Sequence, residues 1–219
     1  MTYRILFAAA LAAAIPAQAQ TDLLDRAVSR YEKTTTARAE FKQTLTNPLT
    51  GSTSISRGVL LRRAPNLLSV KFDGADGDRV VADGTSLWIY SPMSAPGQVI
   101  KLPNSGGAMN NVDPGSQFLV APRKKYNIKA LGSATVGGRA TQIFQLTPRQ
   151  QTAFTKAIVW IDASDASVKK FETTDANGLK RVVEILAWKP NVAIPKSAFR
   201  FSPPAGTRVV DQSALTGAR

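Results

Sequence analysis

Short strand-like segments recur along nearly the whole chain, and this spacing constrains the fold more than any other feature of the sequence. In the first segment Ala39 and Phe41 alternate with Glu40, the period of a strand that has one buried and one wetted face. Turn sequences such as Asp83-Gly84 separate many segments, and connections this short join antiparallel neighbours. The sequence therefore predicts one long antiparallel sheet that curls into a whole or partial barrel. The predicted strands are 37–45, 58–63, 67–72, 79–82, 87–90, 98–101, 126–130, 141–146, 157–162, 168–174, 181–188 and 199–201.

The N-terminus has the pattern of a secretory signal peptide. An apolar run over 5–15 follows Arg4 and leads to the small-residue end Ala17-Gln18-Ala19, which predicts cleavage after Ala19. The run is too short to span a bilayer, and a buried N-terminal helix is the less favoured interpretation. We therefore expect a signal peptide over 1–19, one exported domain over 20–211 and a disordered tail over 212–219.

The chain is strongly basic, with 28 Lys and Arg against 15 Asp and Glu and a formal net charge of +13. An exported protein rarely meets nucleic acid, and the basic residues are scattered instead of being interleaved with aromatic residues on one platform. We predict no nucleic-acid partner. A solvated basic surface, with transient proximity to anionic membrane faces, is the favoured interpretation.

The sequence contains neither His nor Cys. This excludes catalytic triads with a His base, and zinc sites with thiolate or imidazole ligands. Among the acids, the run from Asp73 to Asp78 is the best candidate for a calcium loop or a paired acid site, but its spacing differs from the EF-hand loop and suits an ordinary turn. Asp162 and Asp165 are likewise interpreted as turn residues. We expect no enzyme, no metal and no cofactor.

Two helical segments are expected beside the sheet. Thr21 is a candidate cap for an amphipathic helix whose apolar stripe is Leu23, Leu24, Ala27, Val28 and Tyr31. A long, proline-rich interruption over 91–125 contains Asp113-Pro114, typical of a helix start, followed by Phe118 and Leu119. Such an insertion is usually a lid or a binding loop, and a disordered surface loop is the alternative.

The segment 87–90 is apolar on both faces. Leu87 and Ile89 point one way and Trp88 and Tyr90 the other, because side chains alternate along a strand. Something apolar is therefore expected against the second face.

Several stretches of the chain, in their order and spacing, resemble the outer-membrane lipoprotein carrier protein family (LolA). The stretches are AEFKQ at 39–43, GVLLRRAPNL at 58–67, VADGTSLWIYSP at 81–92, YNIK at 126–129 and FRFSPPAG at 199–206. The resemblance implies a mainly β (α+β) fold, an unclosed antiparallel barrel that is covered by an N-terminal helix and a helical lid and encloses an apolar cavity.

The same resemblance implies a periplasmic, non-enzymatic chaperone that acts as a monomer. Its implied partners are acylated lipoproteins, the inner-membrane ABC release complex and an outer-membrane lipoprotein receptor of similar fold. This chain has no Cys to acylate and so does not match that receptor. A periplasmic lipid or glycolipid binding module of the same fold, which carries no lipoproteins, is the alternative.

The family pattern also implies a set of cavity residues and a latch. In the family, a strand Arg directly before a Pro holds the empty cavity shut by bonding lid carbonyls, but here Ala64 occupies that position. Arg62 shares the face of Ala64 in a regular strand and is the favoured latch, with Arg63 taking that role if a bulge intervenes. The alternatives are that both arginines are exposed and that the apolar residues simply form a core. The predicted cavity residues are Leu24, Ala27, Val28, Tyr31, Leu60, Leu68, Val70, Phe72, Trp88, Tyr90, Phe118 and Leu119.

Overall fold

The computed structural model of this chain describes residues 17–74, 77–104 and 112–212. Most of the expected signal peptide, and all but Gln212 of the expected tail, lie outside these residues, so both remain predictions. In the described ranges, no helix is both long enough and apolar enough to cross a membrane.

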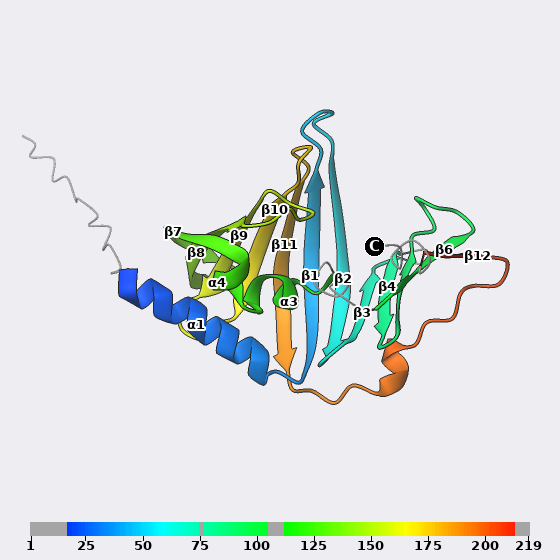
Figure 1. Ribbon diagram of the computed structural model, residues 1–219, viewed down its shortest axis with the longest axis horizontal. Coiled ribbons are helices and arrows are strands. Elements are labelled where there is room, and N and C mark those ends of the chain that lie inside the picture. The colour runs from blue at the N-terminus through cyan, green and yellow to red at the C-terminus, as the bar shows by residue number, and fades with distance from the viewer. Residues whose placement is uncertain (1–16, 75–76, 105–111, 213–219) are drawn as a thin grey trace, which may run out of the picture.

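One mixed, unclosed sheet dominates the described part of the chain (Figure 1). Its strand order is β12-β6-β5-β4-β3-β2-β1-β11-β10-β9-β8-β7, so β12 and β7 form its two edges. This confirms the predicted mainly β, unclosed sheet, with one correction: β12 pairs with β6 in parallel, so the sheet is not wholly antiparallel. The strands are β1 (Thr36–Thr46), β2 (Thr53–Arg63), β3 (Leu67–Phe72), β4 (Arg79–Asp83), β5 (Ser86–Tyr90), β6 (Gln98–Pro103), β7 (Tyr126–Val136), β8 (Arg139–Pro148), β9 (Lys156–Asp162), β10 (Val168–Thr174), β11 (Lys180–Pro190) and β12 (Arg208–Asp211).

The strand order explains why part of the chain lies across the sheet. Strands β1 to β6 and β7 to β11 are two meanders that meet where β1 pairs with β11. Because β6 and β7 lie near opposite edges, the connection between them has to cross a face. That connection carries α3 (Pro114–Leu119) and α4 (Pro122–Lys125), and Figure 1 shows both in front of the sheet, on the same side as α1 (Ala17–Lys33). We call this side the inner face.

The core lies between the inner face and these helices. Leu24 and Ala27 of α1 are 2% and 1% exposed, and Phe118 of α3 is 1% exposed. The apolar stripe predicted for the first helix therefore does face the sheet, but α1 begins at Ala17 and runs through Thr21. Ala and Gln favour helix, so no break occurs at the expected cap, and the predicted cleavage point lies in the first turn of α1.

The C-terminal part differs from the prediction in two places. The segment predicted as a strand at 199–201 instead begins with the last residue of a 3-10 helix, η1 (Lys196–Phe199), which buries Phe199 to 1% exposure. The strand β12 was not predicted, because four residues carry little periodicity of their own. It forms by pairing its backbone with the edge of β6, a long-range contact.

The C-terminal segment also covers the second apolar face of β5. The ring centroid of Phe201 lies 5.8 Å from that of Trp88 and 6.2 Å from that of Tyr90. The Trp88 indole N–H donates to Asp83 Oδ2 at 2.8 Å. Leu87, in contrast, is 2% exposed and belongs to the core of the inner face. Trp88 and Tyr90, which were predicted to line the cavity, therefore pack against the C-terminal segment and line neither of the hollows described below, and their contact with lipid remains a prediction.

Candidate functional site

The inner face holds a hollow of about 520 Å³, which we call the main hollow. Its walls come from β1, β2, β3, β4, β10 and β11, and α3 lies along one side. The volume falls within the range typical of small-molecule pockets, about 300–1,000 Å³. Most of its lining is apolar, namely Ala39, Phe41, Leu45, Leu60, Val70, Phe72, Val80, Val112, Pro114, Ala153, Phe154, Phe171, Leu179, Val183 and Ile185.

A second hollow of about 80 Å³, the minor hollow, lies between α1, α3 and the sheet. It shares Ala39, Leu60, Pro114, Phe171 and Ile185 with the main hollow. The two spaces are therefore neighbours with the N-terminal end of α3 between them.

The structure brings most of the predicted cavity residues together, though not all of them. Leu60, Val70 and Phe72 line the main hollow. Leu24 and Leu68 belong to the buried core but line neither hollow, and Val28 is half-buried and lines neither. Lipid binding by any of these residues remains a prediction. The minor hollow is lined by Ala27, Tyr31, Leu60, Phe118 and Leu119 from the predicted set.

Residues of β1 and β11 form much of the wall but were absent from the predicted set. Phe41 and Leu45 on β1, and Val183 and Ile185 on β11, all line the main hollow. Their period of two is visible in the sequence. What the sequence does not reveal is that β1 and β11, about 140 residues apart along the chain, pair directly in the middle of the sheet.

A buried ion pair connects α3 to the sheet. Arg62 Nε on β2 donates to Asp113 Oδ2 at 3.1 Å, and the two side chains are only 8% and 4% exposed. Asp113 is the N-cap of α3, where its Oδ1 accepts the Gly115 N–H at 3.0 Å. The predicted helix start at Asp113-Pro114 is thereby confirmed, and one carboxylate caps α3 while it pairs with the sheet.

Tyr31 of α1 completes this cluster. Its hydroxyl donates to Asp113 Oδ2 at 2.7 Å, and the Arg62 guanidinium lies over its ring at 4.2 Å from the centroid. Burial, followed by the neighbouring Asp113 carboxylate, raises the pKa of the Tyr31 hydroxyl, which therefore remains a donor. Arg62 Nη1 also donates to the Thr34 carbonyl at 2.7 Å. We call Tyr31, Arg62 and Asp113 the latch cluster.

Arg63 lies on the opposite face of β2, where it donates to the Ile194 carbonyl. Alternation along a regular strand, as expected, therefore places Arg62 and not Arg63 on the side of α3. The partner of Arg62 at the start of α3 is the carboxylate of Asp113, whereas the family pattern implied carbonyls of a lid. A latching role for Arg62 remains a hypothesis.

The C-terminal end of α3 is held locally. Lys125 Nζ donates to the carbonyls of Ser116 and Gln117 at 3.0 and 2.7 Å, and the Tyr126 hydroxyl donates to the Gln117 carbonyl at 2.8 Å. These contacts satisfy carbonyls that a short helix leaves without partners. The donors follow α3 directly in the chain, whereas the latch cluster attaches its other end to distant elements.

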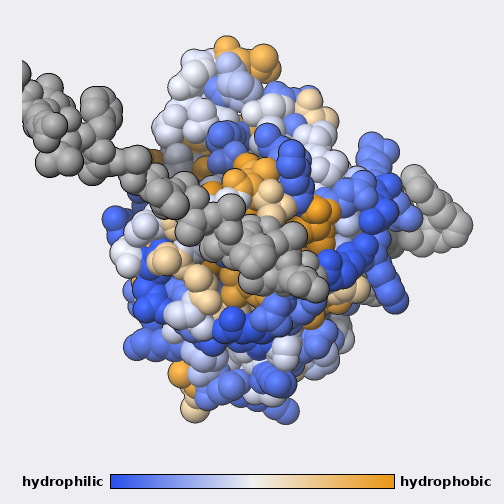
Figure 2. Space-filling model, turned by 90° about the vertical axis from the view of Figure 1, so that its left-hand side faces the viewer, coloured by the Kyte–Doolittle hydropathy of each residue, from blue (hydrophilic) through white to orange (hydrophobic). Residues whose placement is uncertain are grey.

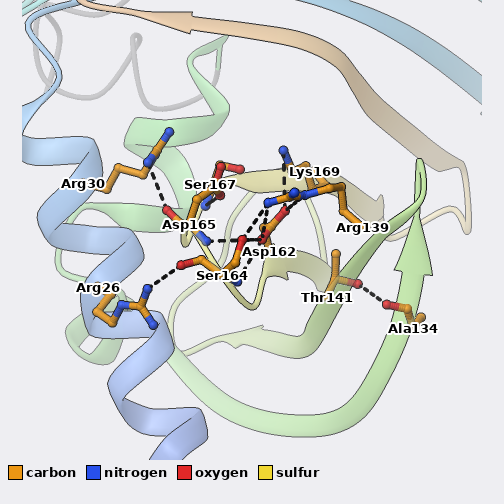
Figure 3. Close-up of polar contacts among 10 residues, drawn as sticks. All are labelled: Arg26, Arg30, Ala134, Arg139, Thr141, Asp162, Ser164, Asp165, Ser167 and Lys169. Atoms are coloured by element: carbon orange, nitrogen blue, oxygen red, sulfur yellow. Dashed lines mark hydrogen bonds and ion pairs between the residues drawn. The ribbon is translucent and has the colours of Figure 1, made fainter.

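Helix α1 is attached to the turn between β9 and β10 (Figure 3). Arg26 donates to the Ser164 carbonyl at 2.8 Å, and Arg30 donates to the Asp165 carbonyl at 3.0 Å. Both arginines reach from one side of the helix to the same turn. This turn therefore positions α1 over the sheet.

Asp162 organises that turn, as the sequence predicted for a turn residue. Its carboxylate accepts the Ser164 and Asp165 N–H groups at 2.9 and 3.2 Å and Arg139 Nε at 2.7 Å, while Lys169 Nζ lies 3.7 Å away (Figure 3). Burial alone would raise its pKa, but the hydrogen bonds from Arg139 and Ser164 hold the pKa of Asp162 well below its usual range. The carboxylate is thus charged at neutral pH and stabilises the turn between β9 and β10, which is the platform that holds α1.

Hydrophobic residues reach the surface on the side where α1 and β7 lie. In the view from the left-hand side of Figure 1, they gather in the middle of the face and hydrophilic residues surround them (Figure 2). An apolar patch framed by polar residues is typical of a binding surface.

Comparisons with known proteins agree with one another. The family model for "Outer membrane lipoprotein carrier protein LolA" matches residues 32–202. An outer-membrane lipoprotein carrier protein from Serratia proteamaculans is 27% identical over 190 residues, covering 84% of this chain and 85% of its own. One from Pectobacterium carotovorum is 25% identical over 213 residues, covering 94% and 95%. The solved structure of an uncharacterized conserved protein from Thermus thermophilus shares the fold, with a TM-score of 0.57, 13% identity and coverage of 89% and 99%.

Proposed function

This chain belongs to the LolA family of outer membrane lipoprotein carrier proteins, and on that premise we propose that it carries acylated lipoproteins across the periplasm. It takes them up as they leave the inner-membrane ABC release complex, shields their acyl chains and delivers them to an outer-membrane receptor of similar fold. It does so as a monomer after cleavage of its signal peptide. The observation that carries the proposal is the apolar main hollow beneath a lid that crosses the open sheet.

The energetics explain why a carrier of this kind needs a lid that resists opening. Burial of each CH₂ group contributes about 0.8 kcal/mol, so one acyl chain of ~15 carbons gains roughly 12 kcal/mol when fully buried. That corresponds to nanomolar binding by a single chain, and several chains held so tightly would not be released. Part of the gain is therefore offset by the free energy needed to open the empty, closed protein.

The latch cluster is suited to set that opening free energy. It joins the N-terminal end of α3 to β2 and α1, whereas the C-terminal end of α3 is held by Lys125 and Tyr126 next to it in the chain. In our proposal α3 swings about its C-terminal end, the Arg62–Asp113 pair separates, and the minor hollow opens into the main one. The platform beneath α1 remains in place during this movement.

Release from membranes tests the proposal. The mature protein is incubated with inner membranes that hold labelled lipoproteins, and the label in the soluble fraction is measured with and without an energised release complex. We expect label in the soluble fraction, bound to the protein in equimolar amount. Label that stays in the membranes contradicts the proposal. Diacylglycerolipids without peptide in the purified protein would instead support a module that binds free lipids.

A further inference from the structure

Part of the lining of the main hollow is polar, and it includes Arg181. On β11 this residue lies two positions before Val183, which is 7% exposed and belongs to the core, so both side chains lie on the inner face. The residues paired with Arg181 are Leu45 on β1 and Thr173 on β10, and all three line the hollow. Arg181 therefore borders the apolar space directly.

Arg181 has no protein partner for its guanidinium among the described residues, with neither a hydrogen bond nor an ion pair. Neighbouring protein atoms shield part of its guanidinium from water, which lowers its pKa, and the nearby Asp175 carboxylate opposes that change. The residue as a whole remains exposed. Arg carries five N–H donors in a rigid plane and remains charged at neutral pH. Such a donor group beside an apolar space is suited to a ligand that brings acceptors to the end of a hydrocarbon chain.

The charges around Arg181 select among such acceptors. Asp175 and Asp78 line the same hollow, and Asp175 Oδ1 already accepts the N–H groups of Asn177 and Leu179 at 2.8 and 2.9 Å. A carboxylate that already lies near the guanidinium disfavours a further anion. Neutral carbonyl oxygens accept hydrogen bonds from Arg181 without adding negative charge.

We propose that Arg181 binds the ester and amide carbonyls at the polar junction of an acylated ligand whose hydrocarbon chains lie in the main hollow. This inference rests on the proposed function and adds a recognition site for the part of the ligand that is not hydrocarbon. It implies that the hollow distinguishes acyl esters and amides from plain hydrocarbons and from free fatty acids.

The test compares apolar ligands that differ in the hydrogen-bond acceptors they carry. Dissociation constants are measured for a triacylated cysteine peptide, palmitamide, palmitate and diphenylhexatriene, a hydrocarbon with no acceptor. The proteins are the parent, Arg181→Met and Arg181→Lys, with Arg57→Met as the matched control, because Arg57 is an exposed residue next to Gly58 on the outer side of β2.

We expect Arg181→Met to weaken binding of the triacylated peptide and of palmitamide about tenfold, as expected for losing a hydrogen bond from a charged donor. Diphenylhexatriene binding remains within about twofold of the parent, Arg181→Lys recovers part of the loss, and Arg57→Met changes nothing. The parent binds palmitamide at least as tightly as palmitate.

Three results would overturn the assignment: equal losses for diphenylhexatriene and the acylated ligands, no loss in Arg181→Met, or a preference for palmitate that disappears in Arg181→Met. The last would make Arg181 an anion site. These results are distinguishable from failure of the proposed function, in which the parent protein binds no acylated ligand at all.

Discussion

Replacing Arg62 by Leu tests whether the latch cluster holds the lid closed. The substitution leaves the Asp113 carboxylate, which is 4% exposed, without its cationic partner. Breaking a buried ion pair from one side typically costs about 3–5 kcal/mol. If α3 can move so that water reaches Asp113, this cost falls on the closed state alone, and even 3 kcal/mol changes the ratio of closed to open lid more than about a hundredfold.

Hydrogen exchange of the α3 amides measures that ratio. We expect Arg62→Leu to lose protection of the amides over 115–119 while the central strands β1 and β11 keep theirs. Arg63→Leu is the matched control, since Arg63 lies on the other face and donates to the Ile194 carbonyl. Adding Asp113→Asn to Arg62→Leu removes the unpaired charge and should restore part of the protection.

The decisive result for the latch hypothesis is a difference between Arg62→Leu and Arg63→Leu in the hydrogen exchange of the α3 amides. Equal exchange of α3 in the parent, Arg62→Leu and Arg63→Leu would refute it. Loss of protection throughout the sheet in Arg62→Leu would also refute it, because Arg62 would then support the fold as a whole and not the lid.

Three further predictions concern the framework around the hollow. Asp162→Asn should destabilise the fold and increase hydrogen exchange in α1. Because the pKa of Asp162 is depressed in the folded protein, its contribution to the free energy of unfolding is present above the unfolded pKa of 3.8 and is lost as the pH falls below about 4. The unfolding free energies of parent and variant should therefore converge in acid. Convergence at neutral pH instead would contradict this. Trp88→Ala should lower the unfolding free energy by about 2 kcal/mol while diphenylhexatriene binding is unchanged, since Trp88 packs on Phe201 away from the hollow; weakened probe binding would return Trp88 to the cavity. Gly58→Ala should lower the free energy of unfolding by about 1–3 kcal/mol, because the added Cβ would overlap the Lys71 carbonyl oxygen and the Phe41 ring. An unchanged melting temperature would contradict this and would show that β2 can shift to make room for the added methyl group.

Local pattern was enough to predict most of the framework. The alternation around Phe41 identified β1, and Asp113-Pro114 identified the start of α3, because periodicity and capping depend on residues close together in sequence. Trp88 shows where such reasoning stops. Its apolar character predicted a covered face, but which segment covers that face depends on Phe201, more than a hundred residues away.

The candidate site was predictable in part for the same reason. Strand parity placed Arg62 on the lid side, whereas its partnership with Asp113 and Tyr31 requires three elements to meet. Arg181 was not identified at all, because nothing in its neighbourhood in the sequence distinguishes an arginine that borders an apolar hollow from one on a wetted face. Only the pairing of β11 with β1 and β10 places it there.

Photocrosslinking from within the main hollow tests the central claim most directly. A photoreactive amino acid is introduced at Ile185, which lines the hollow, or at Trp88, which lies on the other face of the sheet, and each protein is loaded with an acylated lipoprotein released from membranes. We predict that acyl chains are crosslinked from position 185 and not from position 88. Crosslinks from position 88 alone, or none from 185 in a protein that keeps the lipoprotein in solution, would contradict the claim that the hollow holds the acyl chains.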